Sequence, residues 1–372
     1  MLTGVTITTM SLTSLLKNNA ELRNLVPNLK DQLVTLSGSP VTREMWNNPI
    51  SVPSIGISFE AGRIGTAFDY VARALLERQV GTGNVSSQSL VAEQGLSILL
   101  QAIGGSAAFE QRWHEVSEEQ PQFPNFGNGM NSTVMLITQQ RGGGFVQDPA
   151  IAAERAKGFA LAKELDADIL EILAGYWGDA VETKAKFLIG EASIEDYSRC
   201  AIFLAELDGV YRAASVSVLD YCFRDMKIGR AQEGKTYFSQ HNTLSIDELS
   251  ANVAALGKNF EQFAKSTKMT HVELNPTFEH FSTAVGGADA DFIYDATLID
   301  LKSSSKMAYV GVDWAQLLGY AAMKHGLGGN LEQAGMYFAR FNCAAIIRFT
   351  PALKSFLGDY LQAILATAKS AR

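Results

Sequence analysis

The chain has few cysteines and no long apolar run. Only Cys200, Cys222 and Cys343 are present among 372 residues, and no two of them have zinc-ligand spacing. Such scattered cysteines cannot form a disulfide framework and are typical of a reducing compartment. A run of about 18 apolar residues, which a membrane span needs, is lacking, as is the basic and apolar pattern of a signal peptide. We therefore expect a cytoplasmic protein with no membrane partner.

An excess of positive charge is also lacking. The formal net charge is −8, which argues against a protein that coats nucleic acid non-specifically. It does not exclude an enzyme with a local basic groove, since catalytic carboxylates add negative charge of their own. Hydrophobic residues make up 47% of the chain and charged residues 19%, a balance that predicts a globular protein with a sizeable core.

Residue periodicity divides the chain into a helix-rich part and a mixed part. We expect an N-terminal segment at 1–60, a first core helix at 61–80, a helical region at 81–265 and a compact α/β part at 266–372. Ser193, with two acids following it, predicts the start of one long helix.

Further helices and strands follow from the same patterns. Helices are expected at 65–79, within 84–125, and at 150–190, 193–223, 244–267, 313–326, 330–341 and from 351, and strands at 271–274 and 343–350. The overall expectation is an α/β (α+β) fold.

Residues 286–304, GGADADFIYDATLIDLKSS, combine two β-favouring runs with four aspartates. A two-residue turn at Asp295 and Ala296 would make them a hairpin in which Asp291 lies opposite Asp300, with Cβ atoms about 5 Å apart. Because strand side chains alternate, the hairpin would have one acidic and one apolar face. The acidic face would carry Asp289, Asp291, Asp300 and Lys302, and the apolar face Ala290, Phe292, Ile299 and Leu301.

Opposed carboxylates destabilise a sheet unless a ligand lies between them. A divalent cation, Mg²⁺ or Mn²⁺, suits this position because it prefers oxygen ligands. It could activate water for phosphodiester hydrolysis, with Lys302 beside Asp300 steadying the nucleophile or the phosphate. The alternative is a solvated strand face on which Asp289 is an ordinary surface acid and Asp295 a turn residue.

An aspartate at one strand, followed by Asp300-Leu301-Lys302 on the next, resembles the PD-(D/E)xK nuclease superfamily. Gln316 and Tyr320 follow at a spacing of one helical turn, similar to the Gln-x-x-x-Tyr motif of its RecB-like branch. The resemblance implies a restriction-endonuclease-like mixed sheet flanked by helices, with a large helical N-terminal or inserted region.

The resemblance also implies a set of metal ligands. Asp291, Asp300 and the Leu301 carbonyl would bind the ion together with a helix glutamate. Glu206 is our prediction for that glutamate, because its helix is apolar on most sides; Glu77, Glu273 and Glu279 remain alternatives. Gly65 and Asp69 have the spacing of a Gly-x-x-x-His motif found in the branch, with aspartate in place of histidine, so Asp69 is either a site residue or an ordinary helix-surface acid.

The implied activity is a metal-dependent nuclease acting on DNA, in repair, recombination or defence against foreign DNA. Gln316 and Tyr320 would position the scissile backbone. Basic residues nearby in sequence would contact phosphates; these are Lys306, Lys324, His325, Arg340 and Arg348.

Two other classes of protein remain open. One is a catalytically inactive nuclease fold that binds nucleic acid or protein. The other is a helical scaffold with an incidental acidic hairpin, in which the helices of 81–265 serve homo-oligomerisation or a protein partner.

Overall fold

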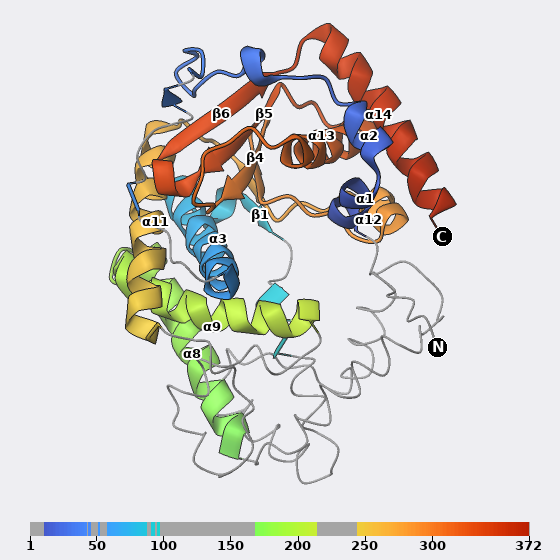
Figure 1. Cartoon of the computed structure of the whole chain (residues 1–372). Coiled ribbons are helices and arrows are strands. Elements are labelled where there is room, and N and C mark those ends of the chain that lie inside the picture. The colour runs from blue at the N-terminus through green and yellow to red at the C-terminus, as the bar shows by residue number, and fades with distance from the viewer. Residues whose placement is uncertain are drawn as a thin grey trace, which may run out of the picture.

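The computed structural model describes eight stretches of the chain (Figure 1). They are residues 11–42, 44–45, 51–52, 58–87, 91–93, 95–96, 168–213 and 244–371. Most of the helix expected within 84–125, the first part of the one at 150–190 and the end of the one at 193–223 lie outside these residues.

Six strands form one mixed sheet in sequence order. The strands are β1 (Val85–Ser87), β2 (Val272–Leu274), β3 (Phe292–Tyr294), β4 (Thr297–Lys302), β5 (Gln333–Phe338) and β6 (Cys343–Arg348). The pairs β1–β2 and β4–β5 are parallel and the other three are antiparallel. The expectation of a mixed sheet flanked by helices is confirmed at this level.

Helices cover both faces of the sheet, so the fold has three layers (Figure 1). On one face lie α3 (Ser58–Val80), α8 (Asp168–Leu188), α9 (Ile194–Ala213) and α11 (Ile246–Ser266). On the other lie α1 (Leu12–Asn18), α2 (Ala20–Asn24), α13 (Gly311–Gly326) and α14 (Pro351–Ser370), with α12 (Glu279–Val285) beside them. In the described part of the chain, no helix is long and apolar enough to cross a membrane.

The two hydrophobic clusters meet the strands on alternate residues, as a two-faced core requires. Phe292 and Ile299 belong to the cluster beneath α3 and α11, and Ile293 and Leu298 to the cluster beneath α13. Phe292, Ile299 and Leu301 lie on one apolar face as predicted, but the opposite face is not purely acidic, because it also buries Ile293 and Leu298. Ala290 was also misplaced, because it belongs with Ile293.

Helix starts follow local sequence. Ser193 accepts a hydrogen bond from the N–H of Asp196, whose carboxylate accepts from Ser193 in return, which confirms the predicted cap of α9. Ser245 and Glu248 form the same reciprocal arrangement at α11. Thr350 caps α14 immediately before Pro351.

The helix predicted at 330–341 is wrong, because β5 occupies its middle half and only a short 3₁₀ turn follows at Ala339–Phe341. Glu, Gln, Ala and Met favour helix locally, but β5 pairs along its length with both β4 and β6. Gly335 permits the close packing of β6, since a Cβ atom there would lie 2.3 Å from Ile346 Cδ1.

The regions into which the sequence was divided pack around the same sheet. β1, within the region predicted as helical, pairs with β2, while α9 and α11 both pack on α3. In the N-terminal segment α1 contacts α13, and Val34 pairs with Ile346 at the far edge of the sheet. The first core helix begins three residues before the predicted 61, at Ser58.

Candidate active site

The β3–β4 hairpin has the predicted register. Tyr294 pairs with Thr297, and Phe292 with Ile299, so Asp295 and Ala296 form the turn. Asp295 has a left-handed φ of 47° and accepts hydrogen bonds from the N–H groups of Thr270 and His271, which confirms it as a turn residue. The ladder ends at Phe292, so Asp291 and Asp300 are not themselves a ladder pair.

Asp291 is held by the backbone of the neighbouring strand. Its Oδ2 accepts a hydrogen bond of 2.5 Å from the N–H of Leu301, between Asp300 and Lys302. The carbonyl of Asp291 accepts from the N–H of Asn275, at the end of β2, at 2.9 Å. Backbone groups of β4 and of the residue after β2 thus hold Asp291 close to the strand that carries Asp300.

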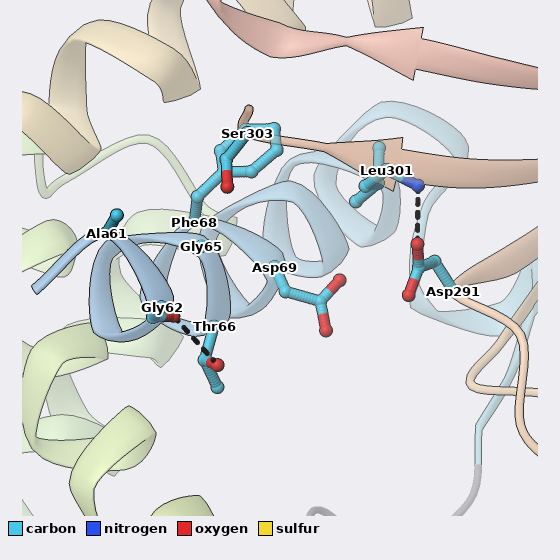
Figure 2. A pocket seen from close by; sticks show the side chains of 9 residues that line it. All are labelled: Ala61, Gly62, Gly65, Thr66, Phe68, Asp69, Asp291, Leu301 and Ser303. Atoms are coloured by element: carbon cyan, nitrogen blue, oxygen red, sulfur yellow. Dashed lines mark hydrogen bonds between the residues drawn. The ribbon is translucent and has the colours of Figure 1, made fainter. Parts of the chain in front are cut away.

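Asp69 on α3 faces Asp291 across a pocket (Figure 2). The pocket has a volume of about 270 Å³ and is lined by Ala61, Gly62, Gly65, Thr66, Phe68, Asp69, Asp291, Leu301 and Ser303. Asp69 also forms an ion pair with Arg73, one turn along the same helix. The Gly65-x-x-x-Asp69 spacing was the sequence signal for this residue, and replacement of the expected histidine had obscured it.

Gly65 lets α3 approach the end of β4. A Cβ atom at this position would lie 2.7 Å from Oγ of Ser303. At Gly62, one turn earlier, a Cβ atom would meet nothing within 4 Å. Gly65 therefore allows α3, which carries Asp69, to lie close to Ser303, the residue that directly follows β4.

The carboxyl groups at this end of the sheet oppose one another's ionisation. Burial raises the pKa of Asp291 well above its usual range, and the charges of Asp69 and then Asp300 raise it further, against the Leu301 hydrogen bond and Arg73. Burial also raises the pKa of Asp300, although Lys302 opposes the rise. The site thus concentrates negative charge in a poorly solvated place.

Lys302 lies between two acids. Its Nζ atom is 2.8 Å from Oδ2 of Asp300 and 3.9 Å from Oδ1 of Asp313, in the first turn of α13. Burial alone would lower the pKa of Lys302, but Asp300 and Asp313 raise it above its ordinary value, so the ammonium stays charged. No sequence motif pointed to Asp313.

Gln316 and Tyr320 lie on the same face of α13, as their spacing predicts. The Gln316 amide donates to the Tyr320 hydroxyl at 2.5 Å and to the Thr13 hydroxyl on α1 at 2.9 Å. Tyr320 stacks on Phe278 with a centroid separation of 5.6 Å. Burial raises the pKa of Tyr320, and the charges of Asp289, Asp300 and Asp291 add to the rise, so its hydroxyl lies in the field of the acids.

Glu206 lies elsewhere. It is buried in the α3–α9 interface, with Oε1 3.6 Å from Nε of Arg63, and it is not among the described residues that line the pocket. The carboxylate in this apolar helix does have a charged neighbour, as expected, but that neighbour is the guanidinium of Arg63. Of the alternatives, Glu77 pairs with Lys184 and Glu273 with Lys324.

The remaining residues predicted to contact DNA differ in exposure. Arg340 is only 1% exposed, and it donates from Nε to the Ser303 carbonyl and from Nη1 to that of Val52, which corrects the predicted phosphate contact. Lys324 forms its ion pair with Glu273 at 2.6 Å. Lys306 is exposed in the loop after β4, and His325 and Arg348 are exposed too.

Carboxylate oxygens are the ligands that a hard divalent cation prefers. Asp69, Asp291 and Asp300 each carry such oxygens. A bound cation would reduce the repulsion that Asp69 and Asp300 exert on the Asp291 carboxylate. Among the described residues, no three or more His, Cys, Asp or Glu side chains are grouped so that they could hold a metal ion. Lys302 and Arg73 instead hold two of the acids.

Comparison of the chain with protein-family models, with curated proteins and with solved structures found no match. The interpretation of the site therefore rests on its own residues.

Proposed function

We propose that the chain is a Mg²⁺- or Mn²⁺-dependent nuclease that hydrolyses phosphodiester bonds, with DNA as its substrate. The observation that carries the proposal is that Asp69 faces Asp291 across the pocket (Figure 2). Asp300, whose charge acts on both Asp291 and Tyr320, pairs with Lys302 at the same end of the β3–β4 hairpin. The order α3, β2, β3, β4, α13, β5 supports it, because the PD-(D/E)xK resemblance implies such a mixed sheet between helices.

Each residue has a role that follows from its position. Asp291, Asp300 and Asp69 would hold the ion, with the Leu301 carbonyl as a further ligand, and the bound ion would supply a more acidic water and charge stabilisation. Lys302 would orient the attacking water or stabilise charge on the phosphate. Gln316 and Tyr320 would position the scissile backbone, and Lys306, exposed in the loop after β4, would contact a phosphate.

The test is incubation of purified protein with linear, circular and single-stranded DNA, and with RNA, in Mg²⁺, in Mn²⁺ or in EDTA. We expect metal-dependent cleavage of DNA that Asp300→Asn and Lys302→Met each abolish. The matched control is Asp359→Asn, an exposed acid on α14, which should cleave like the wild type. Cleavage that survives both site substitutions contradicts the assignment, and no cleavage of any substrate contradicts the function.

A second candidate is a nuclease fold that binds nucleic acid or protein without cleaving it. The observation that favours it is that the acids are already held within the chain, Asp300 by Lys302, Asp69 by Arg73 and Asp291 by the Leu301 N–H. DNA binding that needs no metal, together with no cleavage under any condition, would support it. Roles in DNA repair or in defence against foreign DNA are compatible with either candidate.

A further inference from the structure

The position of Lys302 presents a difficulty for the proposed nuclease. Its ammonium lies 2.8 Å from Oδ2 of Asp300, one of the proposed metal ligands. A divalent cation that binds Asp300 would be placed against a second positive charge, and the two would repel each other. Movement of the ammonium away from Asp300 would therefore favour metal binding.

Asp313 is placed to receive that ammonium. Its Oδ1 lies 3.9 Å from Nζ of Lys302. Asp313 belongs to α13, whereas Asp300 belongs to β4. Asp313 is three residues before Gln316, so the two share the helix face that also carries Tyr320. Its place in the first turn of α13 also favours a negative charge there.

We propose that Asp313 is a positioning residue, to which the Lys302 ammonium transfers when Asp300 binds a divalent cation. The proposal rests on the proposed nuclease function. In the metal-free protein Lys302 bridges the two acids and neutralises Asp300. In the metal-bound protein it pairs with Asp313 and remains charged beside the reacting phosphate. The transfer needs only a rotation of the lysine side chain, because its ammonium already lies 3.9 Å from Asp313.

Binding of Mn²⁺, measured by titration calorimetry, tests this without relying on activity. Asp313→Asn should weaken Mn²⁺ binding about tenfold, because the displaced ammonium loses its second carboxylate. Asp313→Glu should restore most of the affinity, and Asp359→Asn, the exposed control on α14, should leave it unchanged. Lys302→Met alone should bind Mn²⁺ more tightly than the wild type, because the competing cation is gone.

A double-substitution cycle separates this role from a simple effect of negative charge. If Asp313 acts through Lys302, adding Asp313→Asn to Lys302→Met should change Mn²⁺ affinity less than about twofold. An equal loss in both backgrounds would mean that Asp313 acts on the ion directly or on the fold, and would overturn the proposal. So would an Asp313→Asn variant that binds Mn²⁺ as the wild type does.

Cleavage by the same proteins distinguishes this proposal from the one on which it rests. A wild-type protein that neither binds Mn²⁺ nor cleaves DNA overturns both. A wild-type protein that does both, with an Asp313→Asn variant of unchanged affinity and kcat, overturns the role of Asp313 alone. We expect Asp313→Asn to lower kcat and to leave KM for DNA within about twofold, since Asp313 would contact no DNA.

Discussion

The N–H of Leu301 donates a hydrogen bond to the Asp291 carboxylate at 2.5 Å, so the strand that carries Asp300 and Lys302 also holds the preceding acid in place. The interaction joins residues on either side of a tight turn and depends on the register at Phe292 and Ile299. A slip of one residue would turn the side chains of β4 to the other face and separate the two acids. The turn at Asp295 thus determines the geometry of the candidate site.

The stability of the metal-free protein should fall with rising pH because of Asp291. Its pKa is raised in the folded state, so the folded chain holds this proton more tightly than the unfolded chain. The resulting stabilisation is present below the ordinary aspartate pKa of 3.8 and is lost as the pH rises through the raised value. Asp291→Asn removes the titration, so its free energy of unfolding should increase relative to that of the wild type as pH rises.

Urea unfolding in EDTA, from about pH 4 to about pH 8, measures this difference. Asp359→Asn, which changes an exposed acid, is the control. Parallel pH profiles for the wild type and Asp291→Asn would contradict the raised pKa of Asp291, which burial causes first and the charges of Asp69 and Asp300 increase.

Gly62 and Gly65 should respond differently to alanine. Gly62→Ala removes backbone freedom within a helix and meets nothing within 4 Å, so it should stabilise the fold by about 0.5–1 kcal/mol. Gly65→Ala should lose that gain, because its Cβ atom would lie 2.7 Å from Oγ of Ser303. Adding Ser303→Ala should recover it. Chemical denaturation of the four proteins checks this, and equal gains at Gly62 and Gly65 would disprove the close approach of α3 to β4.

Arg340 should matter for stability rather than for DNA binding. Arg340→Ala leaves the carbonyls of Ser303 and Val52 without this donor in a buried place, and we expect a loss of about 2–4 kcal/mol in the free energy of unfolding. Lys306→Ala, at an exposed site, should change it by less than about 0.5 kcal/mol. The opposite result, normal stability with weaker DNA binding in Arg340→Ala, would restore the predicted phosphate contact.

The sequence was most informative where structure is local. The hairpin register followed from a two-residue turn between β-favouring runs, and the cap of α9 from Ser193 and Asp196. It was misleading where tertiary pairing decides the outcome. Gln333–Phe338 contains the helix formers Gln, Ala and Met, yet it becomes an interior strand because β4 and β6 lie on either side.

The same limit applies to the candidate site. Asp291, Asp300 and Lys302 were found because they are close in sequence, whereas Asp69 reaches them from a helix more than 200 residues earlier. The expected burial of Glu206 did not identify its partner either. An acid in an apolar helix needs a partner, but sequence did not say whether the partner of Glu206 is a metal ion or Arg63.

The identity of the third acid can be settled by comparing Asp69→Asn with Glu206→Gln. Glu206→Gln removes the carboxylate that lies 3.6 Å from the buried guanidinium of Arg63, so it should lower the free energy of unfolding by about 1–3 kcal/mol. It should leave Mn²⁺ affinity unchanged, since Glu206 does not line the pocket. Asp69→Asn should weaken Mn²⁺ binding at least tenfold, because it removes a carboxylate from the ion's proposed ligands.

Calorimetric titration with Mn²⁺, at a temperature where circular dichroism shows each variant to be folded, keeps the two effects apart. Asp359→Asn again controls for the loss of one negative charge from the surface. Weaker Mn²⁺ binding in Glu206→Gln, combined with normal binding in Asp69→Asn, would return the third position to Glu206. That outcome would also require α3 and α9 to rearrange when metal binds, because the Glu206 carboxylate now lies 3.6 Å from Arg63.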